Sequence, residues 1–167
     1  MTDEEEIIEK KALELTAQHY LDKMMKSGWT STHTEKRFDH WDVTISNGKQ
    51  EFYTETKIRF VNPDDYKDEG ALIDEYKVNF LQALGMSIIV QFFPCCDVAY
   101  VWPLSEKDTW KQGEKWCKKT HYTNDRKKKK VWYMPFDTKH KRYVDMSDYE
   151  EVFNENLNKV KNEGQWR

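Results

Sequence analysis

Hydrophobic residues in the first third of the chain follow two different spacings. From Glu4 to Lys26 they recur every three or four positions, which predicts a helix that ends at Ser27-Gly28, where glycine accepts a left-handed backbone. From Trp41 to Ser46 and from Phe52 to Phe60, apolar and polar residues alternate, which predicts two strands. Asn47-Gly48 lies between these strands and favours a two-residue type I′ turn, so we expect a tight β-hairpin.

The rest of the chain continues to alternate between helical and strand patterns. A helix is expected from about Ala71 to Leu84, and Gly85 ends it. The apolar run Ser87 to Phe93 is typical of a buried strand, and Asp97 to Trp102 should return as its partner. Beyond Pro103 we expect a short helix, a strand and a final helix, at residues 104–110, 131–134 and 146–160. This order predicts an α/β fold with a mixed central sheet flanked by helices.

Composition places the chain among ordinary globular proteins of a reducing compartment. Charged residues make up 34% and aromatic residues 14% of the 167 positions. The three cysteines, two of them adjacent, do not form a disulfide framework. The first residues do not resemble a signal peptide, and no apolar run approaches about 20 residues. We therefore expect a cytoplasmic, intracellular protein without a membrane partner, and its compact, aromatic-rich sequence favours a phage or mobile-element origin.

Charge is distributed unevenly along the chain. The formal net charge is −3, yet the segment from Trp110 to Tyr143 holds twelve basic and three acidic side chains. Such a segment is typical of a phosphate-binding surface, although a solvated loop without a partner has the same composition. The residues we expect to contact a nucleic-acid backbone are Lys115, Lys118, Lys119, Arg126, Lys127, Lys128, Lys129 and Lys130.

The predicted hairpin carries residues suited to catalysis. Glu55 and Lys57 are two apart in the second strand and therefore project from the same face. The Asn47-Gly48 turn places Asp42 near Tyr53, so the Asp42 carboxylate can reach Glu55 across the strand pair. Two adjacent carboxylates need a cation, and their oxygen atoms suit Mg²⁺ or Mn²⁺. The Thr56 carbonyl is a further candidate ligand, and Lys57 can stabilise charge that develops on phosphorus.

Asp42 followed by Glu55-Thr56-Lys57, on a hairpin after a helix, resembles the PD-(D/E)xK nuclease superfamily. That superfamily includes restriction enzymes and archaeal Holliday-junction resolvases, and the resemblance implies a restriction-endonuclease-like core of αβββαβ order. His40-Trp41 stands where the family name has a proline, a departure that many members share. The resemblance covers residues 1–104. Residues 105–167, a basic, aromatic-rich extension with a C-terminal helix, are expected to pack on the same domain.

The resemblance also nominates two helical residues. Glu14, followed by Ala17, Tyr20-Leu21 and Gly28-Trp29, resembles the first-helix pattern of members whose glutamate joins the metal site. Lys77 resembles an auxiliary lysine of phage-type nucleases. A magnesium-dependent DNA endonuclease, selective for junctions or other structures and acting as a homodimer, is what the resemblance implies. RNA is not excluded as a substrate.

Other interpretations stay open at this point. Glu55 and Lys57 are also compatible with a solvated ion pair, and Glu14 and Lys77 with exposed helix positions. His33 and His40 lie near the predicted site, and loop histidines are more often polar surface. Alternative functions are a sequence-specific restriction-type or mobile-element nuclease, a nucleic-acid-binding relative without catalysis, and a protein inhibitor from a virus.

Overall fold

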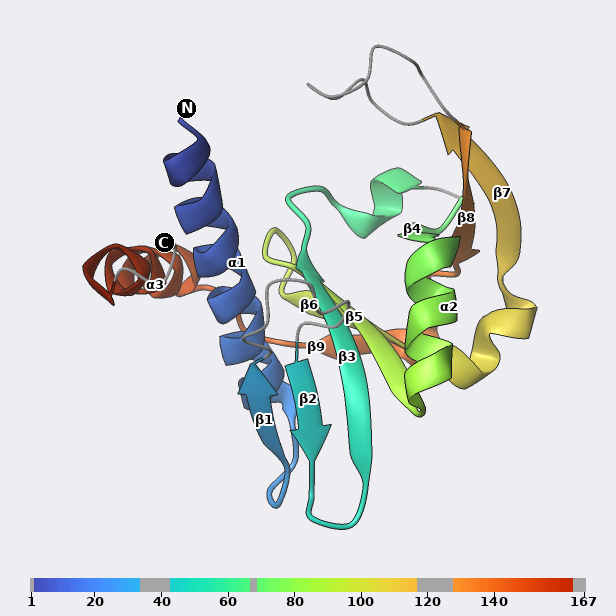
Figure 1. Cartoon of the computed structure of the whole chain (residues 1–167), viewed down its shortest axis with the longest axis horizontal. Coiled ribbons are helices and arrows are strands. Elements are labelled where there is room, and N and C mark those ends of the chain that lie inside the picture. Colours follow the sequence, from blue (N-terminus) through green and yellow to red (C-terminus); the bar gives the residue numbers. More distant parts are fainter. Residues whose placement is uncertain (1, 34–42, 67–68, 117–127, 164–167) are drawn as a thin grey trace.

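The computed structural model describes residues 2–33, 43–66, 69–116 and 128–163, and these form two sheets with helices on both sides (Figure 1). The larger sheet has six strands in the order β1-β2-β3-β5-β6-β9. Their bounds are β1 Thr30–His33, β2 Val43–Ser46, β3 Glu51–Ile58, β5 Ser87–Phe93, β6 Val98–Pro103 and β9 Lys141–Tyr143. Only β3 and β5 are parallel, and the other neighbours are antiparallel. The predicted α/β fold with a mixed central sheet is therefore confirmed.

Helix α1 (Asp3–Met24) covers one face of this sheet together with α3 (Tyr149–Glu163). Thr2 caps α1 through a capping box with Glu5, which satisfies backbone groups that the first turn leaves free. Tyr20 of α1 is fully buried, and its hydroxyl donates to Asp148 just before α3. Asn156 of α3 donates to Thr16 in the same layer. These contacts hold the two ends of the chain against one sheet face.

The opposite face is covered by α2 (Glu75–Leu84) and by a second, three-stranded sheet (Figure 1). That sheet has the order β4-β8-β7, with β4 Ala71–Asp74, β8 Lys128–Met134 and β7 Lys111–Trp116. Short 3₁₀ helices connect the elements at Pro63–Tyr66, Leu104–Thr109 and Thr138–His140. Trp102 and Met134 are fully buried in the core between α2 and the two sheets.

The hairpin between β2 and β3 corrects one prediction. Its loop holds four residues, 47–50, in place of the predicted two-residue turn. The Asn47 side chain accepts hydrogen bonds from the backbone of Lys49 and Gln50, and this local bonding favours the longer loop. As a result Tyr53 pairs with Thr44, so the predicted register, which placed Tyr53 near Asp42, is wrong.

The expected helix from Ala71 to Leu84 is a second correction. Residues 71–74 form β4, and α2 begins at Glu75. Ala71 and Ile73 are buried and their neighbours Leu72 and Asp74 are half-buried, because β4 pairs with β8, which lies far along the sequence. Strands β1, β7 and β9 were not predicted either. The short helix after Pro103 and the strand near residue 131 are confirmed, and the final helix begins at Tyr149.

None of the helices in the described ranges is long and apolar enough to cross a lipid bilayer.

Gly70 is a position where we predict that a methyl group destabilises the fold. Its φ is +94°, and an added Cβ would lie 2.5 Å from the Met134 carbonyl oxygen, in the strand beside β4. Gly70→Ala should lower the free energy of unfolding by more than the roughly 1–3 kcal/mol of backbone strain alone. Gly48→Ala is the control, since φ is +87° there and nothing lies within 4 Å of the added Cβ. Urea unfolding of both variants checks this, and equal losses would contradict the close approach.

Candidate active site

Alternate residues of β3 point to opposite faces of the larger sheet, so its threonines and its charged side chains lie on different faces. Thr54 pairs with Val43, and Val43 packs in the core beneath α1, so Thr54 and Thr56 lie on the α1 face. Glu55 is in register with Ile89, which packs in the core beneath α2. Glu55, Lys57 and Arg59 therefore project from the α2 face, as the alternation predicted.

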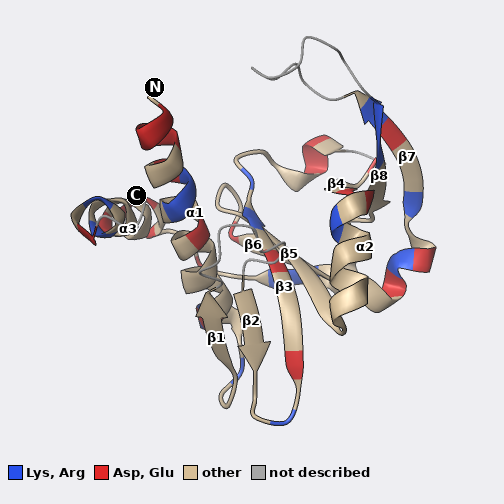
Figure 2. Cartoon of the chain, in the orientation of Figure 1, with Lys and Arg blue, Asp and Glu red and all other residues tan. Residues whose placement is uncertain are grey.

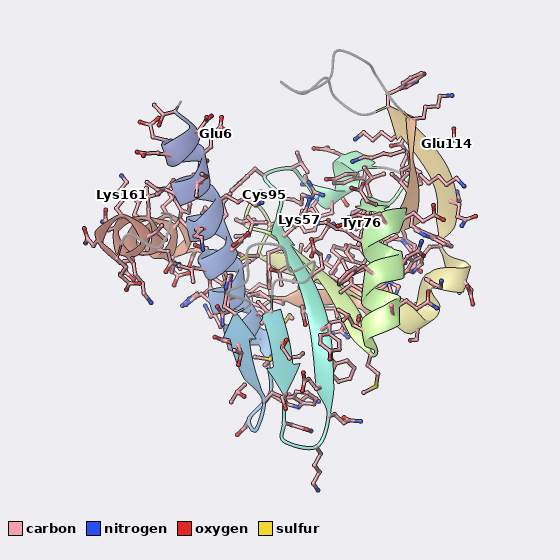
Figure 3. All side chains as sticks on the ribbon, in the orientation of Figure 1. Glu6, Lys57, Tyr76, Cys95, Glu114 and Lys161 are labelled. Carbon is pink, nitrogen blue, oxygen red and sulfur yellow. The ribbon has the colours of Figure 1, made fainter. Side chains whose placement is uncertain are left out.

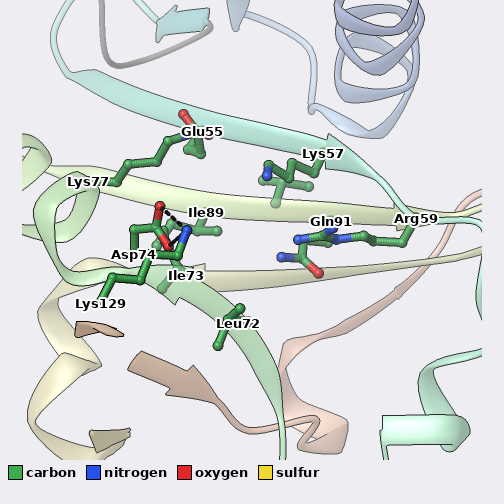
Figure 4. A pocket seen from close by; sticks show the side chains of 11 residues that line it. Glu55, Lys57, Arg59, Leu72, Ile73, Asp74, Lys77, Ile89, Gln91 and Lys129 are labelled. Atoms are coloured by element: carbon green, nitrogen blue, oxygen red, sulfur yellow. Dashed lines mark hydrogen bonds and ion pairs between the residues drawn. The ribbon is translucent and has the colours of Figure 1, made fainter. Parts of the chain in front are cut away.

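These three side chains line a pocket between β3, β4, β5 and α2 (Figure 4). Its volume is about 210 Å³. The remaining lining residues are Leu72, Ile73 and Asp74 of β4, Lys77 of α2, Ile89, Val90 and Gln91 of β5, and Lys129 of β8. Four cationic and two anionic side chains thus share one small space, which favours an anionic ligand.

Glu55 is the most deeply buried charged group in the pocket. It is 4% exposed, and the Lys77 ammonium lies 2.5 Å from its Oε1 atom. Taking a carboxylate out of water is costly, so a close ammonium stabilises its charged form. Lys77 sits in the first turn of α2, which places its side chain over β3. The structure therefore brings together two residues that the sequence had suggested separately.

A second carboxylate–ammonium pair closes the same end of the pocket. Asp74, at the junction of β4 and α2, lies 3.0 Å from the Lys129 ammonium of β8 (Figure 4). Lys129 therefore connects the basic strands β7 and β8 directly to the pocket. Asp74 was not among the predicted site residues.

Lys57 extends from β3 into the pocket, and part of its side chain is exposed to solvent (Figure 3). Burial lowers the pKa of its ammonium, and the neighbouring cations Arg59 and Lys77 lower it further. Glu55 and Asp74 act in the opposite direction. A lysine with a lowered pKa in a cleft is typical of functional sites.

The donor atoms of the pocket fit a hard divalent cation in part. Glu55 and Asp74 supply carboxylate oxygens, the ligand type that Mg²⁺ and Mn²⁺ prefer. Within the described ranges no group of three or more His, Cys, Asp or Glu side chains is placed to hold a metal. Asp42, the other predicted ligand, lies outside these ranges. Mg²⁺ usually keeps several water ligands beside one or two carboxylates, so a small carboxylate set is compatible with it.

Glu14, another predicted metal ligand, lies away from the pocket, whereas for Thr56 the predicted ligand is the backbone carbonyl. Glu14 belongs to α1, on the opposite side of the sheet from α2, and its carboxylate is 3.7 Å from Nε2 of His33. The structure does not bring Glu14 into the pocket lining. Thr56 lies between Glu55 and Lys57 in β3, in register with Val90 of the core beneath α1.

Part of the predicted basic surface is visible on β7 and β8 (Figure 2). Lys115, Lys128, Lys129 and Lys130 lie on these two strands, and their side chains are exposed. The Lys128 ammonium stacks over the exposed Trp116 ring, 5.1 Å from its centroid. Lys118, Lys119, Arg126 and Lys127 lie outside the described residues, as do Cys117, His121 and His40.

Sequence reasoning missed Asp74, Arg59 and Gln91 as lining residues. Arg59 continues the alternation of Glu55 and Lys57, which was a usable signal. Gln91 interrupts the apolar run Ser87 to Phe93, and a lone amide inside a buried strand is also a signal. Asp74 gave no such signal, because its place depends on the pairing of β4 with β8.

The contact between Glu55 and Lys77 gives a prediction about stability. Lys77→Met removes the ammonium beside a buried carboxylate, so the free energy of unfolding should fall by about 2–3 kcal/mol. Glu55→Gln in the Lys77→Met background should recover most of this loss. The control is Lys128→Met, because Lys128 pairs with Glu114 at 3.9 Å on the surface and should cost less than about 1 kcal/mol. Strictly additive effects of the Glu55 and Lys77 substitutions in urea unfolding would contradict the pairing.

Comparisons with known proteins give a distant structural similarity. No family model matches the sequence, and no curated protein matches it significantly. Among solved structures, the chain is similar to Hjc, a Holliday junction resolvase of the archaeal hyperthermophile Archaeoglobus fulgidus. The two chains are 14% identical, the similarity covers 71% of this chain and 87% of that one, and the TM-score is 0.42.

Proposed function

We propose that this protein is a divalent-metal-dependent endonuclease that hydrolyses DNA phosphodiester bonds. The observation that carries the proposal is the pair Glu55 and Lys57, which project side by side from β3 into a charged pocket. A carboxylate and a lysine in this order fit phosphodiester hydrolysis. In this reaction water attacks the phosphorus atom, and negative charge develops on the phosphate.

Three charged groups of the pocket, Glu55, Lys57 and Lys77, have roles in this reaction. Glu55 holds the cation together with Asp42, which directly precedes Val43, the partner of Thr54 in the hairpin. Thr56, which follows Glu55 in β3, offers its backbone carbonyl to the same cation site. When bound, a divalent cation polarises a phosphoryl oxygen and lowers the pKa of a coordinated water. Lys57 faces the phosphate and stabilises the charge that develops on it. Lys77 holds the Glu55 carboxylate in place at 2.5 Å.

The basic strands β7 and β8 supply the DNA-binding surface in this proposal. Their exposed lysines contact phosphates without reading the base sequence, and Lys129 joins this surface to the pocket. A substrate defined by its shape, such as a branched junction, suits such contacts better than a fixed recognition sequence. We also propose that two copies act together, because each pocket then cuts one strand of a duplex. Glu14, on the α1 side of the sheet, has no assigned part in the pocket.

A second candidate is a nucleic-acid-binding protein that has this pocket but no catalysis. The position of Lys77 favours this candidate. Its ammonium contacts Oε1 of Glu55, an oxygen that a metal cation would need as a ligand. This candidate predicts DNA binding that does not depend on metal and no cleavage under any condition.

The nuclease proposal predicts cleavage that requires Mg²⁺ or Mn²⁺ and stops in EDTA. A panel of labelled linear duplex, single strand, four-way junction and RNA identifies the substrate. Asp42→Asn, Glu55→Gln and Lys57→Ala should each lower the rate by about 100-fold or more, since each removes a group that contacts the cation or the reacting phosphate. The matched control is Glu51→Gln, an exposed glutamate on the same strand.

A fully active Glu55→Gln protein would rule out the assigned site. If the wild-type protein binds DNA and cleaves none of the four substrates, the binding protein without catalysis is the correct interpretation.

The basic strands predict a salt-dependent, sequence-independent affinity. A triple variant with Gln at Lys115, Lys128 and Lys130 should weaken binding to every DNA sequence alike. It should also lower the slope of log K against log salt by about 0.9 for each phosphate that the variant no longer neutralises. The control carries Gln at the exposed Lys10, Lys159 and Lys161 of α1 and α3. Fluorescence anisotropy across salt concentrations measures both, and weaker binding to one DNA sequence alone would contradict this role.

A further inference from the structure

The pocket has two ends of different electrostatic character (Figure 4). At the end beside α2, each carboxylate lies against an ammonium: Glu55 against Lys77, and Asp74 against Lys129. The other end holds Lys57, Arg59 and Gln91. Within the described part of the chain, neither Lys57 nor Arg59 forms an ion pair with a carboxylate. The positive charge of the pocket is therefore concentrated at this end.

Unpartnered polar atoms mark the same end. Nε of Arg59 and Oε1 of Gln91 are both buried and have no hydrogen-bond partner among the described residues. Gln91 is 2% exposed and sits in the middle of β5, between apolar neighbours. A buried polar atom without a partner has lost its bonds to water, so a ligand or water that completes these bonds is favoured.

The spacing of the three residues suits a single small anion. Lys57 lies in β3 and Arg59 directly follows the end of that strand, where its backbone N–H donates to the Phe92 carbonyl. Both side chains line the pocket, and Lys57 is in register with Gln91 on the neighbouring strand. A guanidinium offers a planar fork of donors that matches two oxygens of a phosphate. The terminal amide of Gln91 can turn to present its NH₂ group as a further donor.

We propose that Arg59 and Gln91, next to Lys57, form a phosphate-binding subsite beside the position of the cleaved bond. The choice of a nucleic-acid phosphate as the ligand rests on the nuclease function proposed above. The subsite takes a phosphate that is not itself cleaved, and it fixes the position of the strand relative to Glu55. Arg59 and Gln91 are positioning residues in this arrangement, because they act on a neighbouring group of the substrate.

The test measures binding without metal, so that it does not depend on cleavage. Wild-type protein in EDTA is titrated with inorganic phosphate, followed by ³¹P NMR. It is also titrated with two DNA strands of one sequence, one with a 5′-phosphate and one with a 5′-hydroxyl, followed by fluorescence anisotropy. The variants are Arg59→Gln and Gln91→Glu, and the matched control is Arg142→Gln, an exposed arginine of β9.

Arg59→Gln should weaken phosphate and DNA binding by about tenfold or more, because it removes a charge-assisted donor pair. Gln91→Glu keeps the side chain's shape and places a negative charge against the phosphate, so it should weaken binding at least as much. This second variant decides the question if Arg59→Gln does not fold. Arg142→Gln should bind as the wild type does. Weaker binding of both strands identifies an internal phosphodiester as the ligand, and weaker binding of the phosphorylated strand alone identifies a terminal phosphate.

Binding of both Arg59→Gln and Gln91→Glu within about twofold of the wild type would overturn the subsite, since removal of a charged hydrogen bond changes affinity by more than this. Its failure is distinguishable from failure of the nuclease function. A protein that cleaves DNA with metal, and whose Arg59→Gln and Gln91→Glu variants bind normally, has the function without the subsite. A protein that never cleaves, yet whose Arg59→Gln variant no longer binds phosphate, has the subsite alone.

Discussion

A carboxylate at a position that water hardly reaches is the constraint around which the pocket is built. Glu55 is fixed by β3, whose other face must supply Thr54 and Thr56 to the core beneath α1. The charge of Glu55 then requires a nearby cation, and α2 supplies one from its first turn. The first turn of α2 has this position because β4 ends at Asp74. The Asp74 carboxylate forms an ion pair with Lys129 of β8. One buried charge thus links the first sheet, the helix and the second sheet.

Local patterns in the sequence predicted the elements whose own residues carry a strong pattern. The alternation from Phe52 to Phe60 assigned both faces of β3 correctly, and the apolar run at Ser87 to Phe93 gave β5. Strand β4, which pairs with a distant segment, was missed. Ala71 to Asp74 has no strand pattern strong enough to outweigh the adjoining helix, and only pairing with residues 131–134 makes it a strand. The hairpin register failed for a smaller reason, since two backbone bonds to the Asn47 side chain lengthen the loop by two residues.

The candidate site shows the same division. Glu55, Lys57 and Lys77 were found from strand spacing and from a resemblance, and the structure places them in one pocket. Asp74 and Lys129 reach that pocket only through the second sheet, so no spacing rule could connect them. The sequence carried a signal for both Arg59 and Gln91. Arg59 continues the alternation of Glu55 and Lys57, and Gln91 is an amide in an apolar strand. Their significance depends on a neighbour that the sequence does not place, because β4 and α2 lie between β3 and β5 along the chain.

The dependence of β4 on β8 has a consequence for synthesis on the ribosome. When the strands and helix up to residue 104 have left the exit tunnel, β4 still has no partner, and the core beneath α2 still lacks Trp132 and Met134. The core beneath α1 lacks Val144, Met146 and Val152 as well. Contacts between residues so far apart along the chain form late and slowly. The nascent protein is therefore expected to complete the wall of its pocket only after residues 128–134 have left the exit tunnel.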